Sequence, residues 1–445
     1  MRPECFLPHE KEKSMNSLAL IGFILMIVLM FVLIKGYTAP PIAFIFLPLI
    51  AALVAGFGVE DIGGFIKAGM SSMLSTAVLF VFSISYFTLM DEIGLFDPVI
   101  NFLTKKAGNK RWMVLLSALL VTFVAHLDGS GATTFLIVVP AFLPIFKRMG
   151  FRREALLALM CGPYAAMNIL PWGGPTMRAA TVAGIETGDM YSFILPGVVV
   201  IVILAFVNGV VINFLEVRHG LHPETVEELQ AEEVEKTQTY GWRYFFNLGL
   251  TLIMLVFLFL DTPLPLYSIF MIAYGIALVV NFPKAKEQNK KIKSLGINAM
   301  VMTVTLFSVG IFMGVISESG MVEAMATTIV NLLPAAVAPH MHWILALFSV
   351  PLMMILGTDA FYYAMVPIII GVVAPFGVSA EAVAATFLLT ATFGTPISPS
   401  VAAVYVGLGL ADLTIGDHLK YSLKLVWPMS IICLILSTLL GVIPF

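Results

Sequence analysis

The stretch that decides the fold is residues 112–146, which reads WMVLLSALLVTFVAHL, then DGSGATT, then FLIVVPAFLPIF. Each apolar run is too short to cross a bilayer, because a transmembrane helix needs roughly 20 apolar residues. Two half-length helices around a polar, glycine-rich tip predict a re-entrant hairpin. Such irregular backbone is tolerated at membrane depth only where it is buried in protein or faces a watery cavity.

The second half of the chain repeats this pattern. Residues 342–356 and 364–375 are apolar, and a polar tip, GTDAFYY, lies between them at 357–363. We therefore predict two re-entrant hairpins, at 112–147 and 342–375.

An apolar stretch interrupted by prolines follows each predicted hairpin. Residues 154–183 are broken at Pro171-Trp172-Gly173-Gly174-Pro175, and residues 381–410 at Pro396-Ile397-Ser398-Pro399. Proline removes a helix hydrogen bond and clashes with the preceding turn. Each stretch is therefore predicted to be two half-helices with an unwound centre.

The composition places these elements in a membrane. Of 445 residues, 60% are hydrophobic and only 11% are charged, whereas a soluble domain is about 25% charged. The chain is predicted to be an all-α polytopic protein of the cell membrane, surrounded by the lipid bilayer. A net charge of -3 argues against a nucleic-acid partner. Long apolar runs fall at 17–34, 42–58, 70–90, 191–216, 243–260, 264–281, 297–316 and 420–443.

Several landmarks recur in the same order and at nearly the same spacing, which indicates an internal duplication. Lys and Arg flank the first hairpin, none lies near the second, and segment 282–294 carries five lysines. By the positive-inside rule, the two hairpins then enter from opposite sides, so the repeats are predicted to be inverted. The predicted units are a polar tail at 1–16, the first repeat at 17–218, an acidic cytoplasmic linker at 219–242 and the second repeat at 243–445.

Three charged residues stand at the predicted tips and breaks, namely Asp128, Asp359 and Arg178. A charge inside a membrane segment is costly, so a functional role is the default reading. The aspartates can alternatively cap the returning half-helices. Arg178 can clamp a carboxylate with two parallel hydrogen bonds, or it can extend to the membrane interface.

Smaller polar groups surround these charges. His126 can shuttle a proton near neutral pH or simply pack through hydrogen bonds, and Tyr363 is assigned to packing. Hydroxyl and amide side chains can bind carboxylates, but they also cap helices and form hydrogen bonds between packed membrane helices. The candidate substrate-contacting residues are Ser130, Thr133, Thr134, Asn168, Gly173, Gly174, Thr176, Arg178, Thr358 and Ser398.

At these residues the chain resembles the CitMHS family of citrate–divalent-metal:proton symporters, part of the wider ion transporter superfamily. The resemblance runs through nearly the whole chain. It implies a homodimer of elevator-type carriers in a bacterial inner membrane, each with a scaffold part and a mobile transport part. The implied substrate is citrate complexed with Mg²⁺ or Ca²⁺ and taken up with protons. The matching stretches are HLDGSGATT (126–134), NILPWGGPTMRAA (168–180), GTDAFYYAMVPI (357–368) and IGDHLKYSLK (415–424).

The first tip departs from the family pattern. The family commonly carries DGDG, whereas this chain has Ser130 in place of the second aspartate. Hard divalent cations prefer several oxygen ligands, so a possible cation ligand is lost. Our hypothesis assigns Asp128, Asp359 and His126 to the coupling proton or sodium ion, and Arg178 with tip N–H groups to substrate carboxylates. The metal is expected to travel with the substrate, and no permanently bound cofactor is predicted.

Other functions fit parts of the pattern. The first alternative is that the chain is a member of the same superfamily that transports another solute, such as a sodium-coupled dicarboxylate carrier or a sodium/proton antiporter. An intramembrane aspartyl protease needs two membrane aspartates, and a passive channel can also contain duplicated hairpins. The helix breaks beside the hairpins favour a carrier, and the absence of GxxxxGK[ST] and HExxH motifs argues against an ATP-driven pump and a zinc enzyme.

Overall fold

The computed structural model describes residues 8–35, 37–107, 110–221, 241–259, 264–332, 334, 336–399 and 401–445. Every regular element within these residues is a helix, which confirms the predicted all-α class. Among them, six helices are long and apolar enough to cross a membrane, or up to seven if the bent pair Thr303–Glu318 and Met321–Leu332 forms one span. Most of the predicted linker lies outside the described residues, and helix α1 begins at Pro8, inside the predicted tail.

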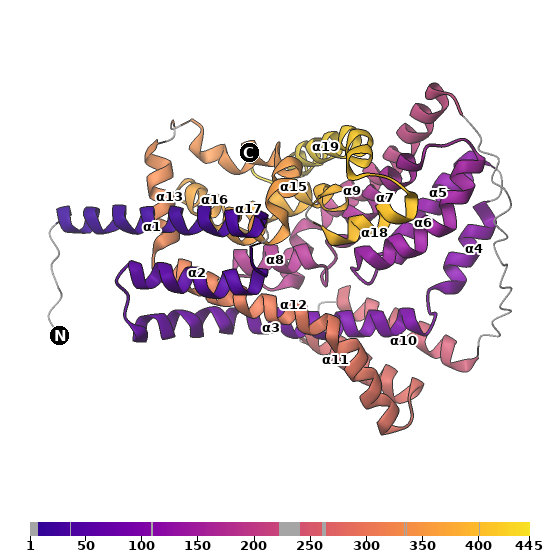
Figure 1. Ribbon diagram of the computed structural model, residues 1–445, viewed down its shortest axis with the longest axis horizontal. Helices are drawn as coiled ribbons and strands as arrows, with labels where there is room; N and C mark the ends of the chain where they lie inside the picture. Colours follow the sequence, from indigo (N-terminus) through magenta and orange to yellow (C-terminus); the bar gives the residue numbers. More distant parts are fainter. Residues whose placement is uncertain are drawn as a thin grey trace.

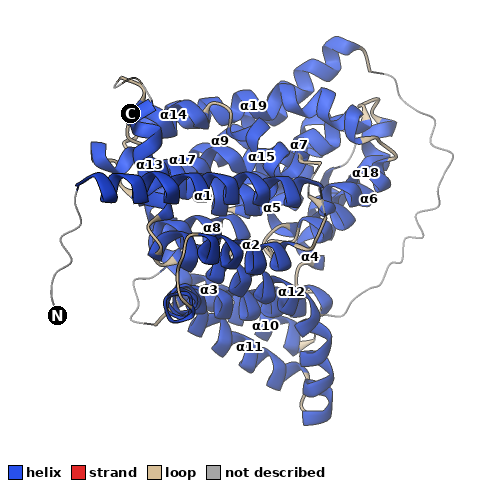
Figure 2. Cartoon of the chain, turned by 60° about the vertical axis from the view of Figure 1, so that its left-hand side comes forward, coloured by secondary structure: helices blue, strands red, loops and turns tan. Residues whose placement is uncertain are grey.

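One layer of the molecule, which we call the long-helix layer, lies along the lower side of Figure 1 and of Figure 2. Its two longest helices, α3 and α12, run side by side. The layer consists of α2 (Pro40–Val54), α3 (Val59–Glu92), α10 (Trp242–Phe259), α11 (Leu266–Asn281) and α12 (Ala285–Glu318).

Glycines set the close crossing of α3 and α12. A Cβ atom added to Gly69 would lie 1.9 Å from the carbonyl oxygen of Gly310, and one added to Gly314 would lie 2.1 Å from that of Phe65. Gly310 and Gly314 form the small-xxx-small pattern with which membrane helices approach closely. Larger residues here would therefore push the two helices apart. At one end of the pair, Lys291 of α12 forms an ion pair with Glu92 of α3.

A second layer, which we call the broken-helix layer, begins with the first hairpin. Helix α5 (Arg111–Ala125) and helix α6 (Gly131–Arg148) meet at an open tip. Gly129 in this tip has a φ of 71°, a left-handed conformation that glycine adopts without steric cost. After the hairpin come α7 (Arg153–Asn168), α8 (Gly174–Ala183) and the long α9 (Thr187–His219).

The same succession of hairpin, broken helix and long helix occurs again near the C-terminus. The second hairpin turns at Gly357, where φ is 72° and ψ is 169°, and a single π-helical turn follows at once. Its elements are η1 (Ala338–His340), α14 (Met341–Ala346), α15 (Ser349–Asp359), η2 (Ala360–Met365), α16 (Val366–Val373) and η3 (Ala374–Phe376). The broken helix and long helix are α17 (Ala380–Ala391), η4 (Thr392–Ile397), α18 (Ala402–Ala411) and α19 (Ile415–Leu439).

Three further helices connect the layers. Helix α4 (Asp97–Ala107) packs on α5, and α13 (Met321–Leu332) packs on α16. Helix α1 (Pro8–Lys35) contacts α2 and α13, and both views place it between the two layers. The largest buried cluster spans both layers, with Phe87 and Phe270 from the long helices and Trp172 from the first break. The tips and breaks therefore lie in the interior, where the two layers meet.

Candidate functional site

The first break is shaped by glycine. A Cβ atom on Gly173 would lie 2.1 Å from the carbonyl oxygen of Asn168, so only glycine fits this turn. A Cβ atom on Gly174 would lie 2.8 Å from Nη1 of Arg178, so its absence leaves room for the guanidinium. These two glycines, predicted as substrate contacts, have a structural reason to be here. They turn the chain and let Arg178 lie back along helix α8.

Arg178 and Asp359 form an ion pair that joins the two halves of the chain. The Nε atom of Arg178 donates to Oδ1 of Asp359 over 2.8 Å. The side chains are 13% and 21% exposed, so Arg178 does not extend to the membrane interface. The two residues were predicted to hold different ligands. The structure brings them together, because α8 of the first half packs against η2 of the second half.

Buried hydroxyl groups lie on the elements that carry or adjoin this ion pair. Thr176, on the first turn of α8, is fully buried, as are Tyr362 and Tyr363 on the π-helical turn, and the structure shows no hydrogen-bond partner for any of the three hydroxyls. Thr358 lies beside Asp359 and is half-buried. Tyr363 packs edge-on against Phe44, as a packing role predicts, and it also lies near both members of the ion pair.

The tip of the first hairpin satisfies most of its polar groups locally. Oδ1 of Asp128 accepts a hydrogen bond from the backbone N–H of Ser130 over 2.8 Å. Ser130 in turn caps helix α6 by accepting from the N–H of Thr133 at 3.3 Å and from its hydroxyl at 2.9 Å. Thr134 donates to the carbonyl of Ser130 and lies 2.6 Å from Nδ1 of His126. The N-cap is therefore Ser130, and Asp128 stabilises the turn before it.

His126 and Asn168 lie behind this tip. His126 is fully buried and its ring lies 4.0 Å from that of Tyr164, measured between centroids. Asn168, the last residue of α7, is also buried, and its side chain lies beside His126. Nε2 of His126 and Nδ2 of Asn168 have no hydrogen-bond partner other than each other. Of the predicted substrate contacts, Asn168 thus groups with the first tip rather than with Arg178.

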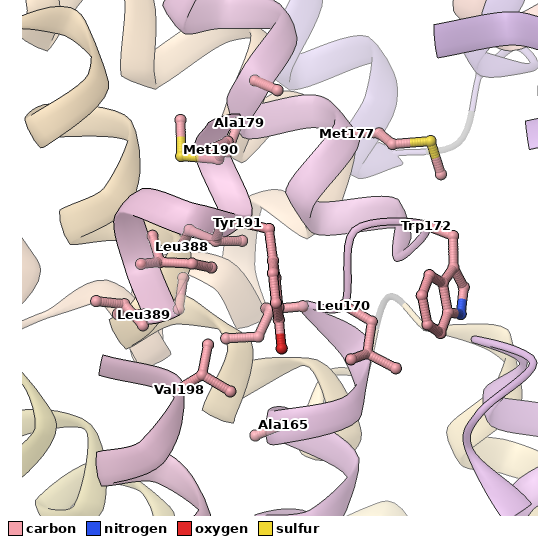
Figure 3. Close-up of a cluster of buried hydrophobic side chains, with 14 of the residues drawn as sticks. Ala165, Leu170, Trp172, Met177, Ala179, Met190, Tyr191, Val198, Leu388 and Leu389 are labelled. Carbon is pink, nitrogen blue, oxygen red and sulfur yellow. The ribbon is translucent and has the colours of Figure 1, made fainter. Parts of the chain in front are cut away.

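The first break contacts both tips. The indole N–H of Trp172 donates to the carbonyl oxygen of Leu127 in the first tip over 2.8 Å, while Arg178 reaches Asp359 in the second. The indole stacks on Phe87 of α3, with centroids 5.3 Å apart. Figure 3 shows Leu170 and Trp172 in the break between α7, which carries Ala165, and α8, which carries Met177 and Ala179. Sequence reasoning missed Trp172, although an indole between a proline and a glycine in a break is an available signal.

The second break is held from two sides. Nε2 of His418 on α19 lies 3.2 Å from the carbonyl oxygen of Pro396, and Thr392 donates to the carbonyl of Ala165 on α7 over 2.9 Å. Ser398 is fully buried at the end of this break. The hydroxyl of Thr395, which sequence reasoning did not single out, is buried without a hydrogen-bond partner.

Unpaired buried polar atoms are a common feature of the tips and breaks. Leaving a buried polar atom unpaired costs roughly 1–3 kcal/mol, so a protein rarely keeps several in one region unless a ligand or water pairs with them. Within the described ranges, no three His, Cys, Asp or Glu side chains converge as a metal site would require. Arg178 adds a cationic donor to this region, and a guanidinium can pair with a carboxylate. The unpaired hydroxyls in this region belong to Thr176, Tyr362, Tyr363 and Thr395.

Comparison with known proteins identifies the class of molecule. The family model described as "Citrate transporter" (CitMHS) matches residues 11–394. The citrate transporter of Bacillus subtilis (strain 168) is 33% identical over 439 residues, covering 96% of this chain and 100% of the relative. The Mg(2+)/citrate complex secondary transporter of the same organism is 30% identical over 437 residues, covering 96% and 99%.

A solved structure shares the fold. The YdaH transporter of Alcanivorax borkumensis, whose crystal structure was described as having an unusual topology, superimposes with a TM-score of 0.59 at 17% identity, covering 88% of each chain. With the family match over most of the chain and its long apolar helices, the chain is a multi-pass membrane transporter and not an enzyme. It belongs to the CitMHS family of citrate transporters.

Proposed function

We propose that this chain imports citrate as a complex with a divalent metal ion and couples the import to protons. The family match and the two citrate-transporting relatives support citrate as the cargo. The observation that carries the proposal is the buried ion pair between Arg178 and Asp359. A guanidinium binds carboxylates in a planar, two-pronged geometry, so Arg178 can hold a carboxylate of citrate in place of the one it holds now.

The ion pair provides a way to couple the two solutes. Asp359 and a citrate carboxylate compete for the same guanidinium. When a proton binds Asp359, its carboxylate loses its charge and its attraction for Arg178. The guanidinium is then left buried without a counter-charge, a costly state that an incoming citrate carboxylate relieves. Proton binding and citrate binding therefore favour each other, which is what symport requires.

Helix ends add to the binding of the anion. Helix α8 begins at Gly174 and helix α6 at Gly131, and their first N–H groups lie at the break and at the first tip. The N-terminus of a helix carries a partial positive charge and unpaired N–H donors, which suit an anionic ligand. We assign these groups, with Thr176 and Thr358, to the remaining carboxylates, and the metal ion to the cargo rather than to the protein.

The first tip is the second candidate for cation coupling. Asp128 is half-buried, interacts electrostatically with Asp91 at the end of α3, and lies near the buried Tyr164. Within the proposal, Asp128 binds the coupling cation, a proton or a sodium ion, and His126 and Asn168 support the tip. The first tip lies where the two layers meet, which fits a transport cycle in which the broken-helix layer moves against the long-helix layer. In the proposal, each protomer of a homodimer carries out this movement.

Uptake of labelled citrate into proteoliposomes tests the proposal. The transport assay uses Mg²⁺, Ca²⁺, Zn²⁺ or Na⁺ separately, each with and without an imposed pH gradient, and Arg178→Ala as the negative control. Accumulation is expected with a divalent ion and an inward proton gradient, and its collapse is expected with a protonophore. Accumulation driven by Na⁺ alone would assign the coupling to sodium instead. No citrate uptake with any cation would overturn the substrate assignment.

A further inference from the structure

Far from the tips, a cavity of about 530 Å³ opens where three helices of the broken-helix layer meet. The start of α7, the end of α9 and the start of α19 all contact one another there, and Figure 1 shows the three helices close together on the same side of the layer. Its walls carry four cationic side chains, namely Arg152 just before α7, Arg218 on α9, and Lys420 and Lys424 on α19. The citrate site described above uses none of them.

A buried carboxylate fixes the geometry of this cavity. Glu216 of α9 is 1% exposed and accepts hydrogen bonds from the backbone N–H of Arg152 at 2.8 Å and from its Nε at 3.0 Å. It also accepts from the hydroxyl of Tyr421 over 2.8 Å, and the guanidinium lies over the Tyr421 ring, 4.8 Å from its centroid. Arg152 is therefore held in place from α9 and α19. Such a network produces a site with a defined shape rather than a loose basic surface.

The charges around the cavity match a singly charged anion. Glu154 and Asp417 line it together with the four cations, and Glu216 neutralises Arg152 from behind. One positive charge remains uncompensated, which suits a phosphodiester better than a trianion such as citrate. Among the described residues, Arg218 and Lys424 form no ion pair with an acidic side chain, so both are available to an external anion.

The surroundings of the cavity point to a membrane lipid. Helices α9 and α19 are both candidate membrane spans, and the apolar Leu215 and Leu425 line the cavity beside the charged residues. Next to Leu215, the face of α9 carries the exposed Val207, Val211 and Phe214, on which an acyl chain can lie. Arg152 belongs to the basic cluster that the positive-inside rule places on the cytoplasmic side, where anionic lipids attract basic pockets between helices.

We propose that the cavity between α7, α9 and α19 binds the phosphodiester headgroup of an anionic membrane lipid, with its acyl chains along α9. The headgroup contacts Arg218, Lys420 and Lys424, while Arg152 forms the rigid back wall. A bound lipid here would tie together the N-terminal end of α7 and the ends of α9 and α19, and so stabilise the broken-helix layer against unfolding.

Lipid binding to the purified full-length protein tests this site. Native mass spectrometry and thermal unfolding are measured with phosphatidylglycerol, with phosphatidylcholine, and with inorganic phosphate or glycerol phosphate as lipid-free anions. The wild type is expected to retain phosphatidylglycerol and to be stabilised by it, and to respond to neither phosphatidylcholine nor the free anions. Lys420→Gln/Lys424→Gln is expected to bind phosphatidylglycerol roughly 30-fold more weakly.

The matched control removes two lysines elsewhere on the chain. Lys286→Gln/Lys290→Gln makes the same change of charge at exposed positions of α12, and its affinity for phosphatidylglycerol is expected to stay within about two-fold of the wild type. Lys420→Arg/Lys424→Arg keeps the charge and is expected to keep the lipid, which separates loss of binding from loss of folding. Equal binding of both lipids, equal losses in the two glutamine variants, or full competition by free phosphate would each overturn the proposal.

Discussion

The two hairpin tips carry an aspartate at matching places in the chain, yet the structure gives these aspartates different partners. Asp128 in the first tip binds the backbone N–H of Ser130, two residues away. Asp359 in the second tip binds Arg178, which lies 181 positions away in the other half of the chain. The first tip is thus stabilised by its own residues, and the second depends on a residue from the other half of the chain.

The local sequence explains this difference. The first tip has glycines at 129 and 131 and hydroxyl residues at 130, 133 and 134, so the chain can turn and offer donors to its own carboxylate. The second tip turns at Gly357 and then continues at once into a π-helical turn that carries Phe361, Tyr362 and Tyr363. Its aspartate finds no comparable local donor and pairs with Arg178. Aspartates at similar places in the two hairpins therefore have different partners.

The largest expected effect follows from removing the partner of the second tip. Arg178→Ala leaves Asp359 largely buried without its counter-charge, so we expect citrate uptake to fall roughly 30-fold or more. The free energy of unfolding should fall by about 2 kcal/mol, because the pair is mostly but not fully buried. Uptake and chemical unfolding are the measurements. Arg178→Ala/Asp359→Ala should regain stability without regaining uptake, and wild-type uptake in the single variant would contradict the assigned role.

Asp359→Asn separates the roles of the two tips further, because it removes the carboxylate proposed to bind the proton and keeps the size and shape of the side chain. Without a competing carboxylate, Arg178 can bind citrate whether or not a proton is present. Exchange of internal for external citrate should therefore persist, while accumulation driven by a pH gradient should be lost. Both are measured in the same proteoliposomes. Gradient-driven accumulation at the wild-type level would show that Asp359 does not carry the proton.

The first tip should respond to the loss of a local hydrogen bond. Asp128→Ala removes the acceptor for the N–H of Ser130, and we expect the free energy of unfolding to fall by about 1 kcal/mol. Asp128→Asn keeps an acceptor oxygen and should lose less stability, while it still removes the charge proposed to bind the coupling cation. Thermal unfolding and gradient-driven uptake, measured on both variants, separate the two roles. Equal stability losses would show that the hydrogen bond contributes nothing.

The smallest effect is expected at the link between the first break and the first tip. Trp172→Phe keeps an aromatic ring for Phe87 but removes the hydrogen bond to Leu127, which should cost about 1 kcal/mol of stability. Uptake should fall a few-fold, because the tip is held less firmly. Trp427→Phe is the matched control, since its indole donates to the carbonyl of Leu347 over 2.7 Å, outside the tips. A similar loss of uptake in Trp427→Phe would show that the effect of Trp172→Phe is not specific to the first tip.

Much of the fold could be predicted from the sequence, because hydropathy and proline act locally. The apolar runs at 70–90, 191–216 and 420–443 fall on α3, α9 and α19, which are long and apolar enough to cross a membrane, whereas α6, assigned to a half-length arm, passes the same test. Pro171 stands between α7 and α8, and Pro396 lies in η4 at the second break. The tip residues follow from glycine and polar side chains between short apolar runs. Since these signals lie within a few residues of one another, no knowledge of distant contacts was needed.

The pairing within the site could not be predicted in the same way. Arg178 and Asp359 meet only because α8 packs on the second hairpin, and nothing local to either residue indicates that contact. The donor role of Trp172 and the buried hydroxyls of Thr395 and Tyr363 likewise depend on tertiary packing. Gly173 and Gly174 were predicted as substrate contacts, which stays a prediction, and the close carbonyl oxygen of Asn168 shows that the turn requires glycine at 173.

The exchange of Asp359 for citrate at Arg178 is tested most directly by the binding of Mg²⁺–citrate at one fixed pH, measured by calorimetry. The wild type, Arg178→Ala and Asp359→Asn are compared after each has been shown to be folded. If the exchange occurs, Arg178→Ala should bind roughly 30-fold more weakly than the wild type, and Asp359→Asn should bind at least as tightly. Wild-type affinity in Arg178→Ala, or equal weakening in both variants, would contradict it.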